Sequence, residues 1–166
     1  IGALAINPPI DLRIASHIIS THLSCWLFNR YYMKLIGNQS QALIKNFPDA
    51  IDPRKNLKTI WDFDASYTAP AGGFKDLDDY YDQCSSKNYL KKIEIPTSVL
   101  CSMDDPFVPP KVFKDIPSNV DFYQPREGGH MGYISSQKTR YGDRRWMDYM
   151  VIEWVNEMSK KAKSVS

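Results

Sequence analysis

Short apolar runs alternate with longer stretches of helical periodicity along this chain. Residues 1–7 (IGALAIN) form an apolar run that Pro8-Pro9 stops, a pattern typical of a buried parallel strand. Residues 97–102 (TSVLCS) form a second such run, and residues 119–124 (NVDFYQ) alternate apolar and polar positions as a third strand does. Because helical segments separate the three runs, we expect a parallel sheet of about three strands in an α/β fold.

The segment between the first two predicted strands is mainly helical in pattern. Asp11 stands where a helix N-cap belongs, and the apolar spacing from there to about Ile36 predicts one long helix or two shorter ones. Residues 38–59 are polar and contain two prolines, which predicts a short helix at about residues 41–47 and a turn after it. Proline and glycine then predict an irregular loop over residues 60–74. Residues 76–89 are expected to return to a helix.

Two helical stretches are dense in large apolar residues. The first contains the aromatic residues Trp26, Phe28, Tyr31 and Tyr32. We prefer to interpret them as a core-facing stripe, and the alternative is a lid that lines an apolar substrate pocket. Residues 144–161 form the clearest helix, in which Trp146, Met150, Trp154 and Met158 are spaced four apart. Such a face is expected to pack on a sheet.

Composition narrows the class of protein. The chain has 166 residues, of which 43% are hydrophobic and 24% charged, as in globular domains with a core. A net charge of +2, with basic and acidic residues interspersed, argues against a nucleic-acid partner. Three widely spaced cysteines without a zinc motif favour a reducing compartment. We find no apolar run long enough to span a bilayer, and we expect no cofactor.

Asp105 and His130 are the residues best placed to perform chemistry. Asp104-Asp105-Pro106 follows the second predicted strand directly, and His130 follows the third strand after Gly128-Gly129. The carboxyl ends of parallel strands meet at one edge of a sheet, where α/β proteins bind ligands. A carboxylate there can hold one tautomer of a histidine and stabilise its protonated form. Asp104 is the rival acid, and we expect it to be a turn residue.

Two other interpretations of these residues stay open. Asp104, Asp105 and His130 could together bind a metal ion, although this set lacks a spacing motif for metal ligands. The pair could also be a feature of a non-catalytic fragment that acts as a binding module. His17 and His22 lie in the first helical stretch, and we interpret both as packing or surface residues.

Several motifs in this chain are similar to those of one enzyme family. They are INPPIDL (6–12), FDASYTAPAGGF (63–74), DYYDQCSS (79–86), DDPFVP (104–109) and GGHMGY (128–133). With them the chain resembles the C-terminal half of the YheT-like branch of the α/β hydrolases. That branch includes bacterial predicted hydrolases, yeast medium-chain ethyl-ester synthase/esterases and mammalian membrane-anchored lipid hydrolases.

The resemblance implies roles for two residues and a division of the chain. It makes Asp105 the acid and His130 the base of a catalytic triad, whose serine comes earlier in a G-x-S-x-G turn. No serine of this sequence stands in that motif, so the resemblance places the nucleophile and the oxyanion hole outside the chain. Residues 1–10 and 94–166 would be the C-terminal half of the hydrolase core, and residues 11–93 a helical cap.

The function implied is that of a serine-type carboxylic-ester hydrolase or acyltransferase acting on small, medium-chain or lipid esters. This chain alone is expected to be inactive, because it supplies the acid and the base without the nucleophile. The expected partners are an ester substrate and the N-terminal half of the fold. A homo-oligomer is a further possibility, because the narrow predicted sheet has an open edge. The implied location is the cytoplasm or the cytoplasmic side of a membrane.

Overall fold

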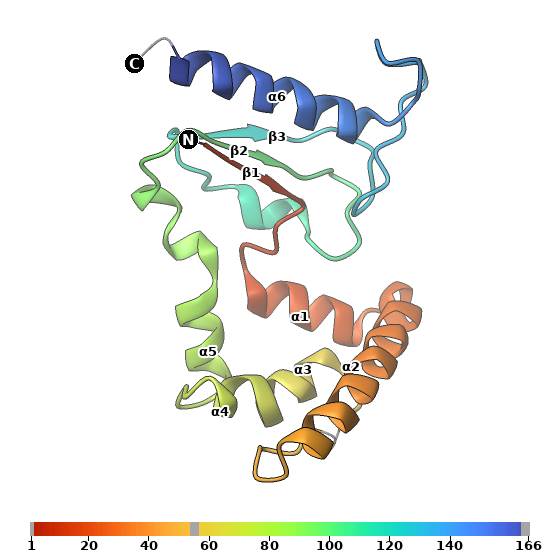
Figure 1. The fold of residues 1–166 in the computed structure, drawn as a ribbon, viewed down its shortest axis with the longest axis vertical. Coiled ribbons are helices and arrows are strands. Elements are labelled where there is room, and N and C mark those ends of the chain that lie inside the picture. Colours follow the sequence, from red (N-terminus) through yellow and green to blue (C-terminus); the bar gives the residue numbers. More distant parts are fainter. Residues whose placement is uncertain (1, 54–56, 164–166) are drawn as a thin grey trace. The chain divides into compact units, whose positions relative to one another are not determined.

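The computed structural model describes residues 2–53 and 57–163, and the chain divides into two compact units. One unit comprises the residues up to Pro9 together with those from Tyr89 onward, and the other comprises Ile10–Asn88. The described strands all belong to the first unit, whereas the second is built from helices and turns (Figure 1).

A three-stranded parallel sheet organises the first unit. Its strands are β1 (Ala3–Ile6), β2 (Thr97–Leu100) and β3 (Val120–Tyr123), and their spatial order is β1-β2-β3. In register, Ile6 pairs with Leu100 and Leu100 pairs with Tyr123. The predicted α/β class, with a parallel sheet and flanking helices, is confirmed (Figure 1).

One face of this sheet is covered by α6 (Trp146–Lys163), close to the helix predicted over residues 144–161. Leu100, Tyr133 and Trp154 form the buried centre of the contact, and the Trp154 ring lies 4.6 Å from that of Tyr123. Val155, the residue after Trp154, is 48% exposed and lies outside this contact. Burial of these large side chains stabilises the unit by about 1.5–3 kcal/mol for each fully buried residue.

Phe122 lies on the opposite face of the sheet from its neighbour Tyr123, because successive side chains in a strand point to opposite sides. The ring of Phe122 stacks on Phe113 at 4.8 Å. Phe113 belongs to η5, the 3₁₀ turn Pro110–Phe113. The unit also contains the 3₁₀ turn η4 (Leu90–Lys92).

The helical unit contains several elements in chain order. They are α1 (Leu12–Thr21), η1 (Leu23–Cys25), α2 (Trp26–Asn46), α3 (Ile60–Phe63), the π-helical turn η2 (Asp64–Thr68), α4 (Ala69–Ala71), α5 (Leu77–Cys84) and η3 (Ser86–Asn88). Asp11 caps α1 as predicted, because its side chain accepts a hydrogen bond from the Ile14 N–H at 3.1 Å. In the described part of the chain, no helix combines the length and apolarity that crossing a bilayer requires.

The prediction of a separate helix at residues 41–47 is wrong, because α2 continues through Gly37 to Asn46. A glycine inside a helix costs only about 1 kcal/mol relative to alanine, so packing of the helix can outweigh it. Ser40 lies in the same turn and is buried, and its hydroxyl donates to the Ile36 carbonyl at 2.7 Å. The polar sequence that predicted a break is therefore accommodated within one helix.

The irregular loop predicted over residues 60–74 is also wrong, because most of this segment is helical from Ile60 to Ala71. Thr59 and Asp62 form a capping box, in which each side chain accepts a backbone N–H of the other residue. Pro70 lies in the first turn of α4, where a missing N–H does not cost a helical hydrogen bond. The helical path ends at Gly73, whose φ of +76° is readily adopted by glycine.

The interpretation of the first aromatic stretch as core-facing is wrong for Trp26, Phe28 and Tyr31. Their exposed fractions are 54%, 45% and 59%. Asn29 occupies the inward face of α2 instead, where its amide donates to the Lys58 carbonyl and accepts from the Ile60 N–H, both at 3.1 Å. These two hydrogen bonds to distant backbone turn a polar residue inward and leave the aromatic residues outside.

A buried polar cluster holds the helical unit together. The Tyr81 hydroxyl lies 2.8 Å from the Ser16 hydroxyl and 2.9 Å from the Asp64 carboxylate, which also accepts from Thr68 at 2.9 Å. Burial raises the pKa of both Asp64 and Tyr81. Three of these four residues belong to the FDASYT and DYYDQ motifs, so these motifs have a packing role within this unit.

Candidate active site

The three strands of the sheet deliver three polar side chains to its carboxyl edge. Asn7 follows β1, Asp105 lies in the loop after β2, and His130 lies in the loop after β3. The backbone continues the pairing beyond the strands, since the Asn7 N–H donates to the Leu100 carbonyl at 2.7 Å. The parallel topology therefore brings the three residues together, although Asn7 and Asp105 are 98 positions apart and Asp105 and His130 are 25 positions apart.

The structure places the two predicted residues in contact. Nδ1 of His130 lies 3.0 Å from Oδ2 of Asp105. The Asp105 side chain is fully buried, whereas the His130 side chain is 36% exposed. The ring of Phe107, which is buried, meets the imidazole edge-on at 4.9 Å. The carboxylate thus holds the buried side of the ring and leaves part of the imidazole accessible.

Hydrogen bonds surround the Asp105 carboxylate. Its Oδ1 accepts from the backbone N–H groups of Phe107 at 2.8 Å and Val108 at 3.0 Å, and its Oδ2 accepts from Asn7 at 2.5 Å. Burial alone would raise the pKa of Asp105, but the hydrogen bonds from His130, Asn7 and the two N–H groups together hold this pKa below its ordinary value. Asp105 is therefore a carboxylate at neutral pH, as an imidazole partner requires.

Asn7 is the member of this site that the sequence pattern did not reveal. Its side chain is buried and connects the loop after β2 with the loop after β3: the amide donates to Asp105 and to the Gly129 carbonyl at 3.2 Å, and its oxygen accepts from the Tyr133 hydroxyl at 2.7 Å. Its φ of +47° is left-handed, a conformation that asparagine tolerates better than most residues. A polar residue directly after a buried strand was the available signal.

The loop that carries His130 is fixed through Gly129. Its N–H donates to the Asp104 carboxylate at 2.8 Å, and its carbonyl accepts from the Ser102 hydroxyl at 2.7 Å. Gly128 has no space for a side chain, since a Cβ there would lie 2.3 Å from the Tyr133 ring. Hydrogen bonds from Ser102 and the Gly129 backbone lower the pKa of Asp104, which contacts the loop and not the imidazole.

Cys101 lies beside Asp105 and is fully buried. Burial, and secondly the negative charge of Asp105, raises the pKa of this thiol to about 12. We expect iodoacetamide at pH 8 to alkylate the exposed Cys84 at least about 1000-fold faster than Cys101, because the thiolate is the reactive form. Peptide mass mapping of native chain against urea-unfolded chain measures this difference, and equal rates in the native chain would contradict the burial of Cys101.

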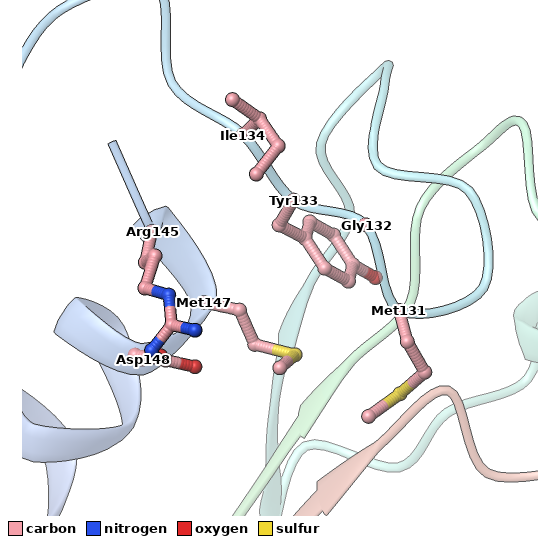
Figure 2. A pocket seen from close by; sticks show the side chains of 7 residues that line it. All are labelled: Met131, Gly132, Tyr133, Ile134, Arg145, Met147 and Asp148. Atoms are coloured by element: carbon pink, nitrogen blue, oxygen red, sulfur yellow. Dashed lines mark hydrogen bonds and ion pairs between the residues drawn. The ribbon is translucent and has the colours of Figure 1, made fainter. Parts of the chain in front are cut away.

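A pocket of about 230 Å³ begins at the residue after His130. Figure 2 shows Met131, Tyr133 and Ile134 of the loop on one side, and the start of α6 on the other. The residues from α6 and the position before it are Arg145, Met147 and Asp148, and an ion pair of 3.3 Å joins Arg145 to Asp148. The pocket wall therefore combines apolar side chains with the charged pair Arg145 and Asp148.

The other titratable residues do not join this site. His17 and His22 are exposed side chains of the helical unit, where His17 lies against the Trp61 ring and His22 lies 2.7 Å from the Ser24 hydroxyl. Both therefore lie on the surface or in packing contacts, as predicted. Within residues 2–53 and 57–163, no three side chains of the types that bind metals are grouped as a metal site.

Comparison with known proteins finds several relatives of this chain. A candidate esterase of Synechocystis is 28% identical over 174 residues, which covers 95% of this chain and 46% of the relative. The candidate esterase YheT of Escherichia coli is 26% identical over 93% of this chain and 46% of its own length. The chain is a relative of the YheT-like α/β hydrolases. A monoacylglycerol lipase of Saccharomyces cerevisiae is 28% identical over 87% of this chain and 34% of its own length.

The matches cover most of this chain but only part of each YheT-like relative. Nearly the whole of this chain is matched, yet it spans less than half the length of the curated relatives. The match is consistent with the C-terminal half of the hydrolase, in agreement with the resemblance seen in the sequence. No protein-family model and no solved structure matches the chain.

Proposed function

We propose that the complete protein is a serine-type carboxylic-ester hydrolase or acyltransferase, with Asp105 as the acid and His130 as the base of its triad. The observation that carries the proposal is the 3.0 Å contact between a buried carboxylate and a partly exposed imidazole at the carboxyl edge of a parallel sheet. The names of its YheT-like relatives, which include esterases and monoacylglycerol lipases, support ester chemistry. The substrates proposed are small, medium-chain or lipid esters.

In this proposal Asp105 orients the imidazole of His130 and keeps its proton on Nδ1. With the proton on Nδ1 directed at the carboxylate, Nε2 is free to accept the proton of a serine hydroxyl. The serine oxygen attacks the ester carbonyl, and the protonated His130 returns the proton to the departing alcohol. Water then repeats the sequence on the acyl-enzyme and releases the acid, or an alcohol takes its place and forms a new ester.

We place the serine and the oxyanion hole in the part of the YheT-like relatives that this chain does not span. The serines of this chain lack the G-x-S-x-G context, and Ser102, which lies closest in sequence to Asp105, donates its hydroxyl to Gly129. Residues 1–10 and 94–166 then belong to the core, and residues 11–93 form a cap. The compact helical unit Ile10–Asn88 supports this division. The 166-residue chain alone should not turn over esters.

Labelling with a fluorophosphonate tests this proposal on the complete protein made from its native gene. The probe is expected to modify one serine of a G-x-S-x-G turn, because the activated hydroxyl is the nucleophile. His130→Ala should reduce the labelling rate by at least about 100-fold, since a general base typically contributes that much. His17→Ala is the matched control and should label at the unaltered rate, since His17 is an exposed histidine of the helical unit.

Two outcomes would count against the proposal. If the complete protein has no serine that the probe modifies, the non-catalytic binding module becomes the better interpretation of the Asp105–His130 pair. If the 166-residue chain hydrolyses esters and loses this activity with His130→Ala, the nucleophile lies within the chain and its placement outside is wrong. Intact mass and N-terminal sequencing of the native product identify which chain is being measured.

A further inference from the structure

The outer side of α2 and of the turn before it exposes large apolar residues in a row. Leu23, Leu27 and Tyr31 are spaced four apart, which places them on one face of a helix, and they are 88%, 69% and 59% exposed. Trp26, which is 54% exposed, flanks this row. Contiguous exposed apolar side chains of this kind mark binding surfaces, because soluble proteins normally bury such residues.

Basic residues belong to the same face. Arg30 and Lys34 are three and seven residues after Leu27, which places them along the same row, and the Arg30 guanidinium lies 5.5 Å from the centre of the Trp26 ring. No acidic residue occurs between Asp11 and Asp49. Neither Arg30 nor Lys34 is ion-paired with a residue that the structure describes. The face therefore combines exposed apolar groups with uncompensated positive charge.

The inward side of α2 explains why this face cannot turn into the unit. Asn29 is held by the backbone of Lys58 and Ile60, and Ser40 and Met33 lie on the same side as Asn29. These contacts set the rotation of α2 about its own axis. Because the helix is fixed in this orientation, Leu23, Leu27 and Tyr31 stay directed away from the core of the helical unit.

We propose that this α2 surface, made of Leu23, Trp26, Leu27, Arg30, Tyr31 and Lys34, docks on an anionic lipid bilayer with α2 lying in the plane of the membrane surface. Leucine side chains enter the boundary of the acyl region, and Trp and Tyr side chains prefer the headgroup level. Arginine and lysine contact lipid phosphates. The basic residues of this face, in a segment without an acidic residue between Asp11 and Asp49, suit anionic lipid headgroups, and a contact with a second copy is an outcome of the test. The proposal does not depend on the chemistry of Asp105 and His130.

Vesicle binding tests the proposal on the complete protein made from its native gene, because the exposure of α2 must hold with the rest of the fold present. The probes are vesicles of phosphatidylcholine with about 30% phosphatidylglycerol, and vesicles of phosphatidylcholine alone, compared by co-flotation. We expect at least about tenfold stronger partition onto the anionic vesicles at low salt, and loss of most of this difference at high salt, because salt screens exposed charges. Tryptophan emission should shift to shorter wavelength on binding, and brominated lipids should quench Trp26.

Variants distinguish this face from nonspecific adsorption. Arg30→Glu with Lys34→Glu should weaken partition by at least about tenfold, since each basic residue near the surface contributes about fivefold. Leu27→Ser should weaken it several-fold. Lys91→Glu and Ile134→Ser are the matched controls in the other unit, with Ile134 70% exposed against 69% for Leu27. Both controls should bind within about twofold of the unaltered chain, and circular dichroism checks that each variant is folded.

Three results would overturn the proposal. The first is equal partition onto neutral and anionic vesicles, or no partition onto either. The second is an equal loss of binding in the control variants, which would show adsorption of the whole chain. The third is a dimer that Leu27→Ser dissociates while vesicles bind nothing, which would make this face a contact between two copies. Fluorophosphonate labelling is measured without lipid, so failure of one proposal leaves the other testable.

Discussion

Replacing Asp105 with asparagine is expected to lower kcat/KM of the complete protein by about 10⁴-fold. The oxygen of the new amide can still accept from the N–H groups of Phe107 and Val108, but its NH₂ group would face the donors of Asn7 and His130. The imidazole would then favour the tautomer with its proton on Nε2, which cannot accept the serine proton. Because this loss arises in the transition state, KM should change little while kcat falls.

Asp104→Asn is the control that separates the two neighbouring carboxylates. Asp104 is exposed and accepts the Gly129 N–H at 2.8 Å, and an asparagine oxygen can keep this hydrogen bond. We therefore expect less than about tenfold loss in kcat/KM. Initial rates on a chromogenic ester, with active sites counted by fluorophosphonate titration, measure both variants. A loss for Asp104→Asn as large as that for Asp105→Asn would remove the distinction between the rival acids.

Asn7→Gly is expected to lower the free energy of unfolding of the chain by about 2–4 kcal/mol at neutral pH. Glycine adopts the φ of +47° without strain, so the variant removes the side chain alone. Its loss leaves the Tyr133 hydroxyl and one oxygen of Asp105 without their buried partner. Urea unfolding followed by tryptophan fluorescence and circular dichroism measures the difference.

The pH dependence of this variant follows from the pKa of Asp105. Folding lowers the pKa of Asp105 below the value of about 3.9 that an aspartate has in an unfolded chain. The carboxylate therefore stabilises the folded chain fully above about pH 3.9, and this contribution is lost as the pH falls through the folded pKa. Removing the Asn7 donor brings the folded pKa closer to the unfolded one. The stability deficit of Asn7→Gly should therefore be largest near pH 7 and shrink below about pH 4.

Tyr133→Phe is the matched variant for this measurement. It removes the hydroxyl that donates to Asn7 at 2.7 Å but keeps the amide of Asn7 on Asp105. We expect a deficit of about 1–2 kcal/mol that is nearly constant between about pH 3 and pH 7. The role assigned to Asn7 would be wrong if Asn7→Gly were as stable as the unaltered chain, or if both variants showed the same pH dependence.

The local sequence pattern predicted an element correctly where the contacts of that element in the folded chain favour the same secondary structure. Short apolar runs bounded by proline became β1 and β2, the alternating run became β3, and Asp11 caps α1 as its position indicated. Their order along the chain also predicted that Asp105 and His130 would share one edge of the sheet. This inference needed only that the strands be parallel and adjacent, because parallel strands direct their carboxyl ends to the same side.

Features that depend on distant partners could not be predicted. The helical course of residues 60–71 rests on a capping box at Thr59 and on packing, which override the proline and glycine that indicated a loop. The outward aromatic residues of α2 result from Asn29, whose backbone partners lie about thirty residues away. Periodicity shows that a helix has two faces, but only contacts from other elements decide which face is covered.

The sequence by itself determined the α/β class, the parallel order of strands and the two residues that meet as carboxylate and imidazole. Tertiary structure alone decided that Asn7 joins them, because its partners Asp105 and Tyr133 are 98 and 126 positions away. A hydrogen bond leaves no local mark in the sequence when its donor and acceptor belong to different loops. The buried network around Asp105 thus became visible only once the strand ends were placed side by side in space.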